Sequence, residues 1–331
     1  MRFFIIDLFK AIAAQLIVLH HLVAYGPVAN AVAVAVPTLA HWLYDYARMA
    51  VQVFLVVGGY LAARSVEGPH KGTVWSAIRK RYLRLVVPFL VALLITTLVA
   101  TLVRPGFIDE AMPAVPTLTQ VLAHVFLLHG VLDYESLSAG VWYVAIDFQL
   151  YVLFALLAWY SRHALRLHLG IVIALTLASL FHFNRDSSFD DWAVYFFGAY
   201  GLGVLAFHIS RQPRPMPWLA LLLSVSVAAL WLDFRGRIFV ALCVALALVL
   251  LRNIEIHRQW PQRMAAYFGT NSYALFLVHF SLCLAGNALF VHLGWESPLA
   301  GVLMLVLVWL SSNLLAHVFY RCVEHPASRL H

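Results

Sequence analysis

Apolar residues occur along this chain in repeated runs, and short polar stretches separate the runs. Most runs approach the length of about 20 residues that a helix needs to cross a bilayer. The pattern predicts an all-α fold, a polytopic membrane helical bundle of about ten transmembrane helices. The predicted spans are 7–25, 46–63, 85–103, 141–160, 167–183, 192–208, 217–233, 237–251, 269–291 and 299–320.

Two further apolar stretches are not predicted to span the membrane. Residues 118–132 are too few for a span, so we expect a re-entrant or interfacial helix there. Residues 26–45 are rich in alanine and valine and carry prolines at 27 and 37, and we expect an outer loop at the membrane interface. Neither stretch is counted among the ten predicted spans.

Charge orients the predicted spans in the membrane. With a cytoplasmic N-terminus, most basic residues fall on inner loops and most acidic residues fall on outer loops. Lysine and arginine collect on the cytoplasmic side of membrane proteins, so we predict that both termini are cytoplasmic. The net charge of +7 is spread along the inner loops, where it faces anionic lipid, and it gives no reason to expect a nucleic-acid partner.

Composition excludes a soluble protein, because 63% of the 331 residues are hydrophobic and only 11% are charged. Cys243, Cys283 and Cys322 lie in predicted spans or at their inner ends, without CxxC spacing. His124 and His129 are five residues apart with no carboxylate at ligand spacing. We therefore expect neither a disulfide nor a metal site.

The first predicted span carries ionisable residues within an apolar sequence. At about 100° per residue, Lys10 and His21 come within roughly 20° of the same helix face and lie about 16 Å apart along the axis. A lysine alone can reach to the interface, and a histidine alone can bond a neighbouring helix. Two such groups in register on one span favour a functional face.

Two other places in the chain put charge beside or inside spans. Arg81 and Arg84 end a basic run just before an apolar segment, where such a run usually anchors the chain to lipid. Asp147 lies well inside a predicted span, and acids in that position are paired or functional. We favour His21 as the partner of Asp147, with Lys10 or Arg48 as the alternatives.

Together these motifs resemble the acyltransferase 3 family. The matching residues are Asp7-x-x-Lys10-x10-His21, Gly59-Tyr60, Arg81-x-x-Arg84, Trp142 with Asp147-x-Gln149-x-Tyr151, Ser272-Tyr273 with His279, and Tyr320-Arg321-x-x-Glu324-x-Pro326. The chain departs from the family pattern at Gly58, where the family has serine, at Lys10, where arginine is commoner, and at Asp147, where the family has glutamate.

The resemblance implies a membrane O-acyltransferase. Members move acyl groups, often acetyl, from acyl-coenzyme A to sugars and other acceptors. We therefore expect cytoplasmic acyl-CoA as the donor substrate, no permanently bound cofactor, and the hydroxyl of an extracytoplasmic carbohydrate or lipid-linked glycan as the acceptor. We also expect a multi-pass protein of a bacterial-type inner membrane, with residues 1–331 forming one acyltransferase domain and no appended esterase-like domain.

The resemblance also suggests a role for each charged residue. Arg81 and Arg84 would hold the phosphates of acyl-CoA, since guanidinium groups bind phosphate in a bidentate way. Lys10 would neutralise a phosphate or orient the pantetheine arm. His21 would be the general base, oriented by Asp147. A covalent acyl-His21 intermediate remains an open variant.

Two other functions fit the same scaffold. Charges inside the membrane and broken helices also serve a transporter or flippase for a glycan or an acylated metabolite. Against transport, the two halves of the chain show no internal repeat. A structural partner of a glycan synthase would not need Lys10 and His21 in register.

Overall fold

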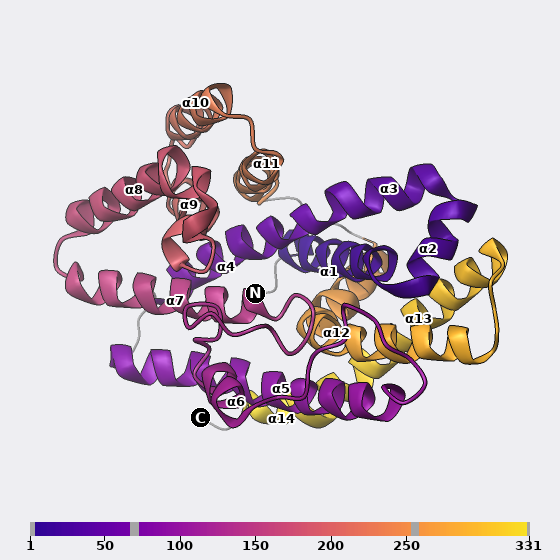
Figure 1. Cartoon of the computed structure of the whole chain (residues 1–331). Helices are drawn as coiled ribbons and strands as arrows, with labels where there is room; N and C mark the ends of the chain where they lie inside the picture. Colours follow the sequence, from indigo (N-terminus) through magenta and orange to yellow (C-terminus); the bar gives the residue numbers. More distant parts are fainter. Residues whose placement is uncertain (1–3, 67–72, 253–257, 330–331) are drawn as a thin grey trace. The chain divides into compact units, whose positions relative to one another are not determined.

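The structure, a computed structural model, describes residues 4–66, 73–252 and 258–329, and it contains no strand in these ranges (Figure 1). The helices are α1 (Phe4–Ala24), α2 (Gly26–Ala35), α3 (Pro37–Tyr46), α4 (Val51–Val66), α5 (Val74–Val103), α6 (Leu118–Val125), α7 (Trp142–Tyr160), α8 (Leu165–Phe181), α9 (Ala193–Ser210), α10 (Met216–Leu232), α11 (Gly236–Leu250), α12 (Gln259–His292), α13 (Pro298–Phe319) and α14 (His325–Ala327). The all-α prediction is confirmed.

Eight helical segments in the described part of the chain are long and apolar enough to cross a membrane. They are Phe4–Ala24, Pro37–Val66, Val74–Val103, Trp142–Tyr160, Leu165–Arg185, Ala193–Ser210, Gln259–His292 and Pro298–Ala327. The two remaining predicted spans, 217–233 and 237–251, coincide with α10 and α11, which have 17 and 15 residues. The polytopic bundle is confirmed, while the count of ten and the cytoplasmic termini stay predictions.

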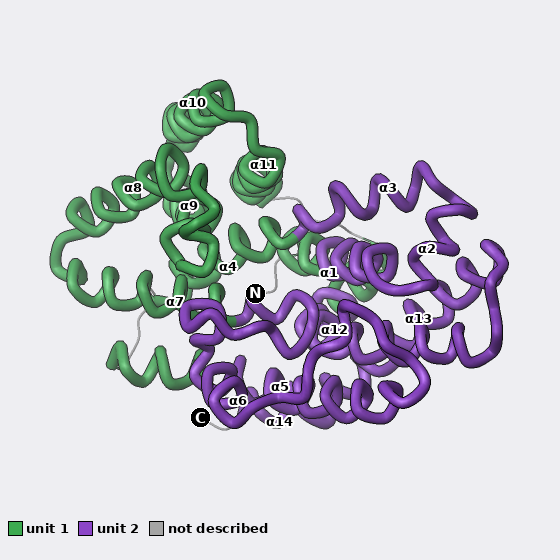
Figure 2. The backbone as a smooth tube through the Cα atoms, viewed as in Figure 1, with its two compact units in different colours: residues 1–10, 51–82, 145–266 green, residues 11–50, 83–144, 267–331 purple. Residues whose placement is uncertain are grey.

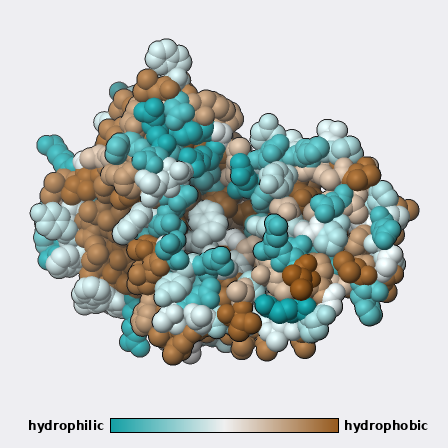
Figure 3. Space-filling model, viewed as in Figure 1, coloured by the Kyte–Doolittle hydropathy of each residue, from teal (hydrophilic) through white to brown (hydrophobic). Residues whose placement is uncertain are grey.

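Apolar areas lie beside hydrophilic ones on the face seen in Figure 3. Large hydrophobic side chains such as Leu98, Leu102 and Leu314 are exposed on long helices. Exposed apolar surface of this extent marks a surface that contacts membrane.

Two predicted boundaries are wrong. Residues 26–45 form the helices α2 and α3 instead of a loop, because each proline stands in the first turn, where its missing N–H and fixed φ suit a helix. The helix α5 begins at Val74 and not at residue 85. Its first turns carry arginine, lysine and leucine, which favour helix, so the basic run is helical and not a loop.

The fold has two compact units, each built from three separate stretches of chain (Figure 2). Unit 1 comprises residues 1–10, 51–82 and 145–266, and unit 2 comprises residues 11–50, 83–144 and 267–331. The expectation of a single acyltransferase domain over 1–331 stays a prediction.

In unit 1, α4 packs closely on α9. A Cβ atom on Gly59 would overlap the carbonyl oxygen of Tyr200, and one on Gly203 would overlap the carbonyl oxygen of Val56. Only glycine lets the two backbones touch in this way. α9 also packs on α8 and α11, so it is the central helix of this unit.

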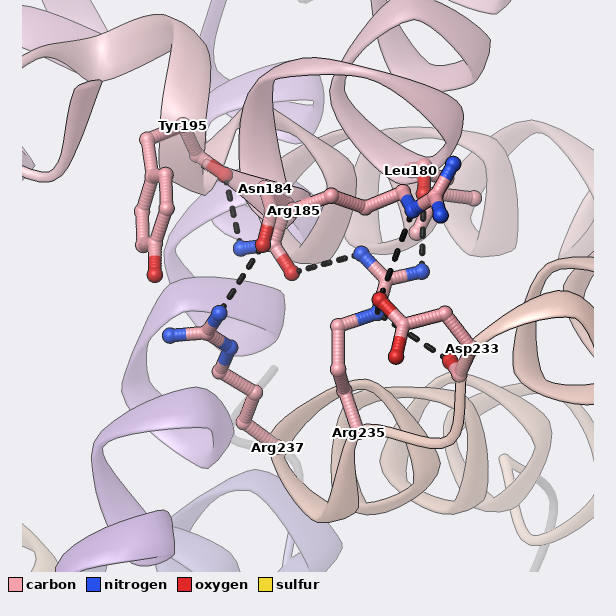
Figure 4. Close-up of polar contacts among 7 residues, drawn as sticks. All are labelled: Leu180, Asn184, Arg185, Tyr195, Asp233, Arg235 and Arg237. Carbon is pink, nitrogen blue, oxygen red and sulfur yellow. Dashed lines mark hydrogen bonds and ion pairs between the residues drawn. The ribbon is translucent and has the colours of Figure 1, made fainter. Parts of the chain in front are cut away.

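A polar cluster in unit 1 joins the end of α8 to the start of α11 (Figure 4). The guanidinium of Arg235 donates to Asn184 Oδ1 at 3.0 Å and to the carbonyl oxygen of Leu180 at 2.8 Å. Arg237 donates to the carbonyl oxygen of Asn184 at 2.8 Å, and Asp233 pairs with Arg185 at 3.4 Å. Arg235 thus bonds a free carbonyl in the last turn of α8, which is a helix-capping role, and Arg237 bonds a carbonyl in the turn that follows.

In unit 2, amide side chains bond helices to one another. Asn287 of α12 accepts from the Val28 N–H at 2.9 Å and donates to the carbonyl oxygen of Tyr25 at 3.3 Å, across the break between α1 and α2. Gln15 of α1 accepts from Trp309 Nε1 and donates to Asn313 Oδ1, both at 2.7 Å. Such bonds satisfy polar groups that have no water to bond inside a bilayer.

Candidate active site

A pair of buried imidazoles joins α1 to α12 in unit 2. His21 is 7% exposed and His279 is fully buried. Nδ1 of His21 lies 2.7 Å from Nε2 of His279, and the ring planes are within 6° of one another. The contact has the distance and orientation of a hydrogen bond in the plane of both rings.

The surrounding bonds determine which nitrogen carries each proton. Nδ1 of His279 lies 2.8 Å from the carbonyl oxygen of Phe276, which can only accept, so this nitrogen is the donor. In a neutral imidazole the other nitrogen, Nε2, then accepts, and Nδ1 of His21 donates to it. The lone pair of His21 is therefore on Nε2, which makes no hydrogen bond to any residue in the described ranges.

Gly140 brings the segment between α5 and α7 against the edge of His21. Its φ is +78°, a left-handed conformation that favours glycine. A Cβ atom there would lie 3.0 Å from Cε1 of His21 and 3.4 Å from the ring of Phe276. The backbone at Gly140 is thus part of the wall around the His21 imidazole.

Helix α6 anchors the segment that leads to Gly140. Thr117 and Gln120 form a capping box at its N-terminus, and Gln120 Nε2 also donates to the carbonyl oxygen of Glu135 at 2.9 Å. His124 Nδ1 donates to the Gln120 carbonyl at 2.8 Å, and its Nε2 accepts from the Leu137 N–H at 3.2 Å. These bonds hold residues 135–137, three residues before Gly140.

His129 stacks on His124 with ring centroids 4.1 Å apart. It is 1% exposed, and neither ring nitrogen has a hydrogen-bond partner among the described residues. Burial, together with the neighbouring His124, lowers the pKa of His129 to about 3. In the same described ranges no three histidine, cysteine or acidic side chains gather as metal ligands would.

A buried ion pair joins α5 to α7 in unit 1. Nη2 of Arg81 lies 2.5 Å from Oδ2 of Asp147, whose side chain is 5% exposed. The Arg81 guanidinium also stands over the Tyr151 ring, 5.4 Å from its centroid. A Cβ atom on Gly58 would lie 3.4 Å from Oδ1 of Asp147, so the serine that the family carries there would place a hydroxyl beside this carboxylate.

Comparison with known families agrees with these motifs. The family model described as an acyltransferase domain matches residues 3–317. The chain belongs to the acyltransferase 3 family. No curated protein and no solved structure matched the chain.

The protein is therefore a multi-pass membrane acyltransferase. Of the residues proposed for its site, His21 is buried near the end of α1 and Lys10 lies on the same helix, half-buried. Arg84 is exposed on α5. The structure pairs Asp147 with Arg81, a partner that the sequence analysis did not consider.

Sequence reasoning did not pair His279 with His21. It placed His279 in a family motif and in the middle of a span, where a polar cavity and a hydrogen bond to a neighbouring helix were equal alternatives. Its bond to His21 joins residues 258 positions apart.

Proposed function

We propose that this acyltransferase moves an acyl group, with acetyl as the expected one, from cytoplasmic acyl-CoA to a hydroxyl of an extracytoplasmic or membrane-associated glycan. The acceptor would be a carbohydrate or a lipid-linked glycan, and the protein would act in a bacterial-type inner membrane, in contact with lipid and without nucleic acid. The observation that carries the proposal is the buried His21, whose Nε2 holds an unshared lone pair.

The lone pair on Nε2 suits His21 to act as a general base. It would take the proton of the acceptor hydroxyl while the hydroxyl oxygen attacks the thioester carbonyl. The carbon–sulfur bond then breaks, the acyl group stays on the acceptor oxygen, and coenzyme A leaves as a thiolate. That thiolate takes the proton back from His21, so the base is restored at the end of each turnover.

The basic residues would bind the donor, acyl-CoA. Arg84 is exposed and free to approach a phosphate of acyl-CoA, and Lys10 would neutralise a phosphate or orient the pantetheine arm. Arg81 already bonds Asp147 through Nη2. A guanidinium has five N–H donors, so Arg81 could bind phosphate while it keeps that bond. Asp147 would then act by holding Arg81 in place.

The test uses purified protein in nanodiscs with radiolabelled acetyl-CoA, and it follows both thiol release and the fate of the label. His20 is the matched control, because it precedes His21 on α1 but its Nδ1 bonds the Leu43 carbonyl at 3.2 Å. We expect thiol release to be lost in His21→Ala and retained in His20→Ala. Label that remains on the protein would indicate an acyl-His21 intermediate.

One outcome would overturn the proposal. If the wild type neither binds nor turns over acetyl-CoA, even with crude cell-envelope glycans added, the donor is not acetyl-CoA. Uptake of glycan or acylated metabolite into vesicles that contain the protein would then be the experiment for a transporter.

A further inference from the structure

We infer that His279 is a positioning residue for this reaction: it holds His21 in the reactive tautomer and shares the proton that His21 takes from the acceptor. The inference rests on the proposed role of His21 as the base. In hydrolase triads a carboxylate orients the catalytic imidazole. Here neither His21 nor His279 bonds a carboxylate within the described part of the chain.

The orientation of His279 itself comes from the backbone of α12. Its Nδ1 lies 2.8 Å from the Phe276 carbonyl oxygen and 3.2 Å from that of Leu275. Both carbonyls belong to the helix that carries His279, so the ring cannot turn without losing these bonds. Nε2 is therefore always presented to His21 as an acceptor.

The pair can accommodate one added proton in two ways. When Nε2 of His21 is protonated, the ring carries two N–H groups, and its bond from Nδ1 to His279 becomes charge-assisted and stronger. If the Nδ1 proton then crosses the 2.7 Å bond, His279 becomes the cation and His21 is neutral again, with its proton on Nε2. When His279 is the cation, the carbonyls of Phe276 and Leu275 stabilise its Nδ1–H group.

In the part of the chain that the structure describes, the other titratable rings that contact His21 are those of His20 and Tyr25. The His20 ring centroid lies 5.2 Å from that of His21, and the Tyr25 ring lies 5.7 Å away. Cys283 is buried one helical turn beyond His279. None of these is an anion in its ordinary state at neutral pH, and the Asp109 carboxylate, which interacts with Cys283, is not among the groups that act on either imidazole. The second imidazole is therefore the group that can share the positive charge.

Two substitutions of His279 distinguish orientation of the His21 ring from sharing of the added proton. In His279→Gln the amide oxygen can accept from Nδ1 of His21 but cannot take its proton, whereas His279→Ala can do neither. We expect the kcat of acetyl transfer to fall about 100-fold or more in His279→Ala and about tenfold in His279→Gln, with KM for acetyl-CoA unchanged. His20→Gln is the matched control, and it should retain wild-type kcat.

The pH–rate profile tests the shared proton. In His279→Gln the acid limb of kcat/KM should move to lower pH, because the added proton is then held by one imidazole alone. A profile that overlaps with the wild type would overturn proton sharing. Near wild-type kcat in His279→Ala, with Cys283 still protected from thiol reagents as a sign of folding, would overturn the positioning role.

A spectroscopic measurement keeps this inference distinct from the proposed function. In the ¹⁵N spectrum of histidine-labelled protein, the His21 signals are assigned by their loss in His21→Ala. We expect a protonated Nδ1 and an unprotonated Nε2 in the wild type, and a mixture of tautomers in His279→Ala. Unaltered His21 signals in His279→Ala would refute the inference even if acetyl transfer depends on His21.

Discussion

Replacing Gly140 by alanine should damage catalysis through one methyl group. At φ +78° an L-residue costs about 1–2 kcal/mol more than glycine. The new methyl carbon would also lie 3.0 Å from Cε1 of His21. Carbon atoms in contact prefer about 3.5–4.0 Å, so the imidazole must retreat by roughly 0.5 Å or more.

The two effects have different readouts. Backbone strain lowers the free energy of unfolding by about 1–2 kcal/mol wherever a left-handed glycine is replaced. Displacement of His21 lowers the rate of acyl transfer instead. Since a 1 Å misplacement of a reacting group can cost about 100-fold in rate, half that shift predicts a loss of about tenfold.

Gly294 is the matched control. It also has a positive φ, +64°, but a Cβ atom there would meet nothing within 4 Å. Gly294→Ala should therefore lose the same stability and keep full transfer activity. Stability can be followed by labelling the buried Cys283 with a thiol dye during heating, after the exposed Cys243 and Cys322 are replaced by serine.

Two results would refute this reasoning. Equal losses of transfer in both glycine variants would show that strain, and not contact with His21, limits activity. Full transfer by folded Gly140→Ala would show that the Gly140 backbone does not confine the His21 ring.

Three further predictions concern folding and stability, measured as folded yield or as thermal unfolding in detergent. Arg81→Ala leaves the Asp147 carboxylate buried without its guanidinium, so it should cost about 3–5 kcal/mol, and Asp147→Asn should cost less because Arg81 is 28% exposed. Gly203→Ala puts a methyl group onto a backbone carbonyl of α4 and should abolish folded yield, whereas Gly170→Ala, with nothing within 4 Å, should gain about 0.5–1 kcal/mol. Because the pKa of His129 is about 3 in the folded chain and near 6.5 in the unfolded chain, the folded chain binds fewer protons and stability should fall as pH drops from 6.5 toward 3. The stability of His129→Phe should depend less on pH in this range.

Each of these predictions has an opposite outcome. A larger loss in Asp147→Asn than in Arg81→Ala would mean that the carboxylate is not the more costly group to leave unpaired. Normal folded yield of Gly203→Ala would contradict backbone contact between α4 and α9. If the stability of His129→Phe falls at low pH as much as that of the wild type, the loss of stability comes from other titratable groups.

Much of the fold followed from the sequence, because bilayer thickness dictates how long an apolar helix must be. The predicted ends of helices were less accurate where the residues near a helix start determine where the helix begins. Pro27 and Pro37 read as loop signals, yet in a first turn proline starts a helix. Arg81 read as part of an inner loop, but it lies within α5.

The candidate site was predictable only along single helices. The register of Lys10 and His21 follows from helical periodicity, which the sequence contains directly. The pairing of Arg81 with Asp147 joins residues 66 positions apart, and that of His21 with His279 joins residues 258 apart. Which helices become neighbours depends on packing of the whole bundle, and apolar runs alone do not encode it.

The bond between His21 and His279 also bears on how the protein is made. The helix α1 leaves the ribosome first, and the partner of His21 follows 258 residues later. A carboxylate at the centre of a span raises the free energy of insertion by about 2.5–3.5 kcal/mol, whereas an uncharged imidazole avoids that burden. Each histidine can thus enter the bilayer on its own helix without a counter-ion. His21 acquires this partner only when α12 is in place, so a chain still in synthesis lacks half of the histidine pair.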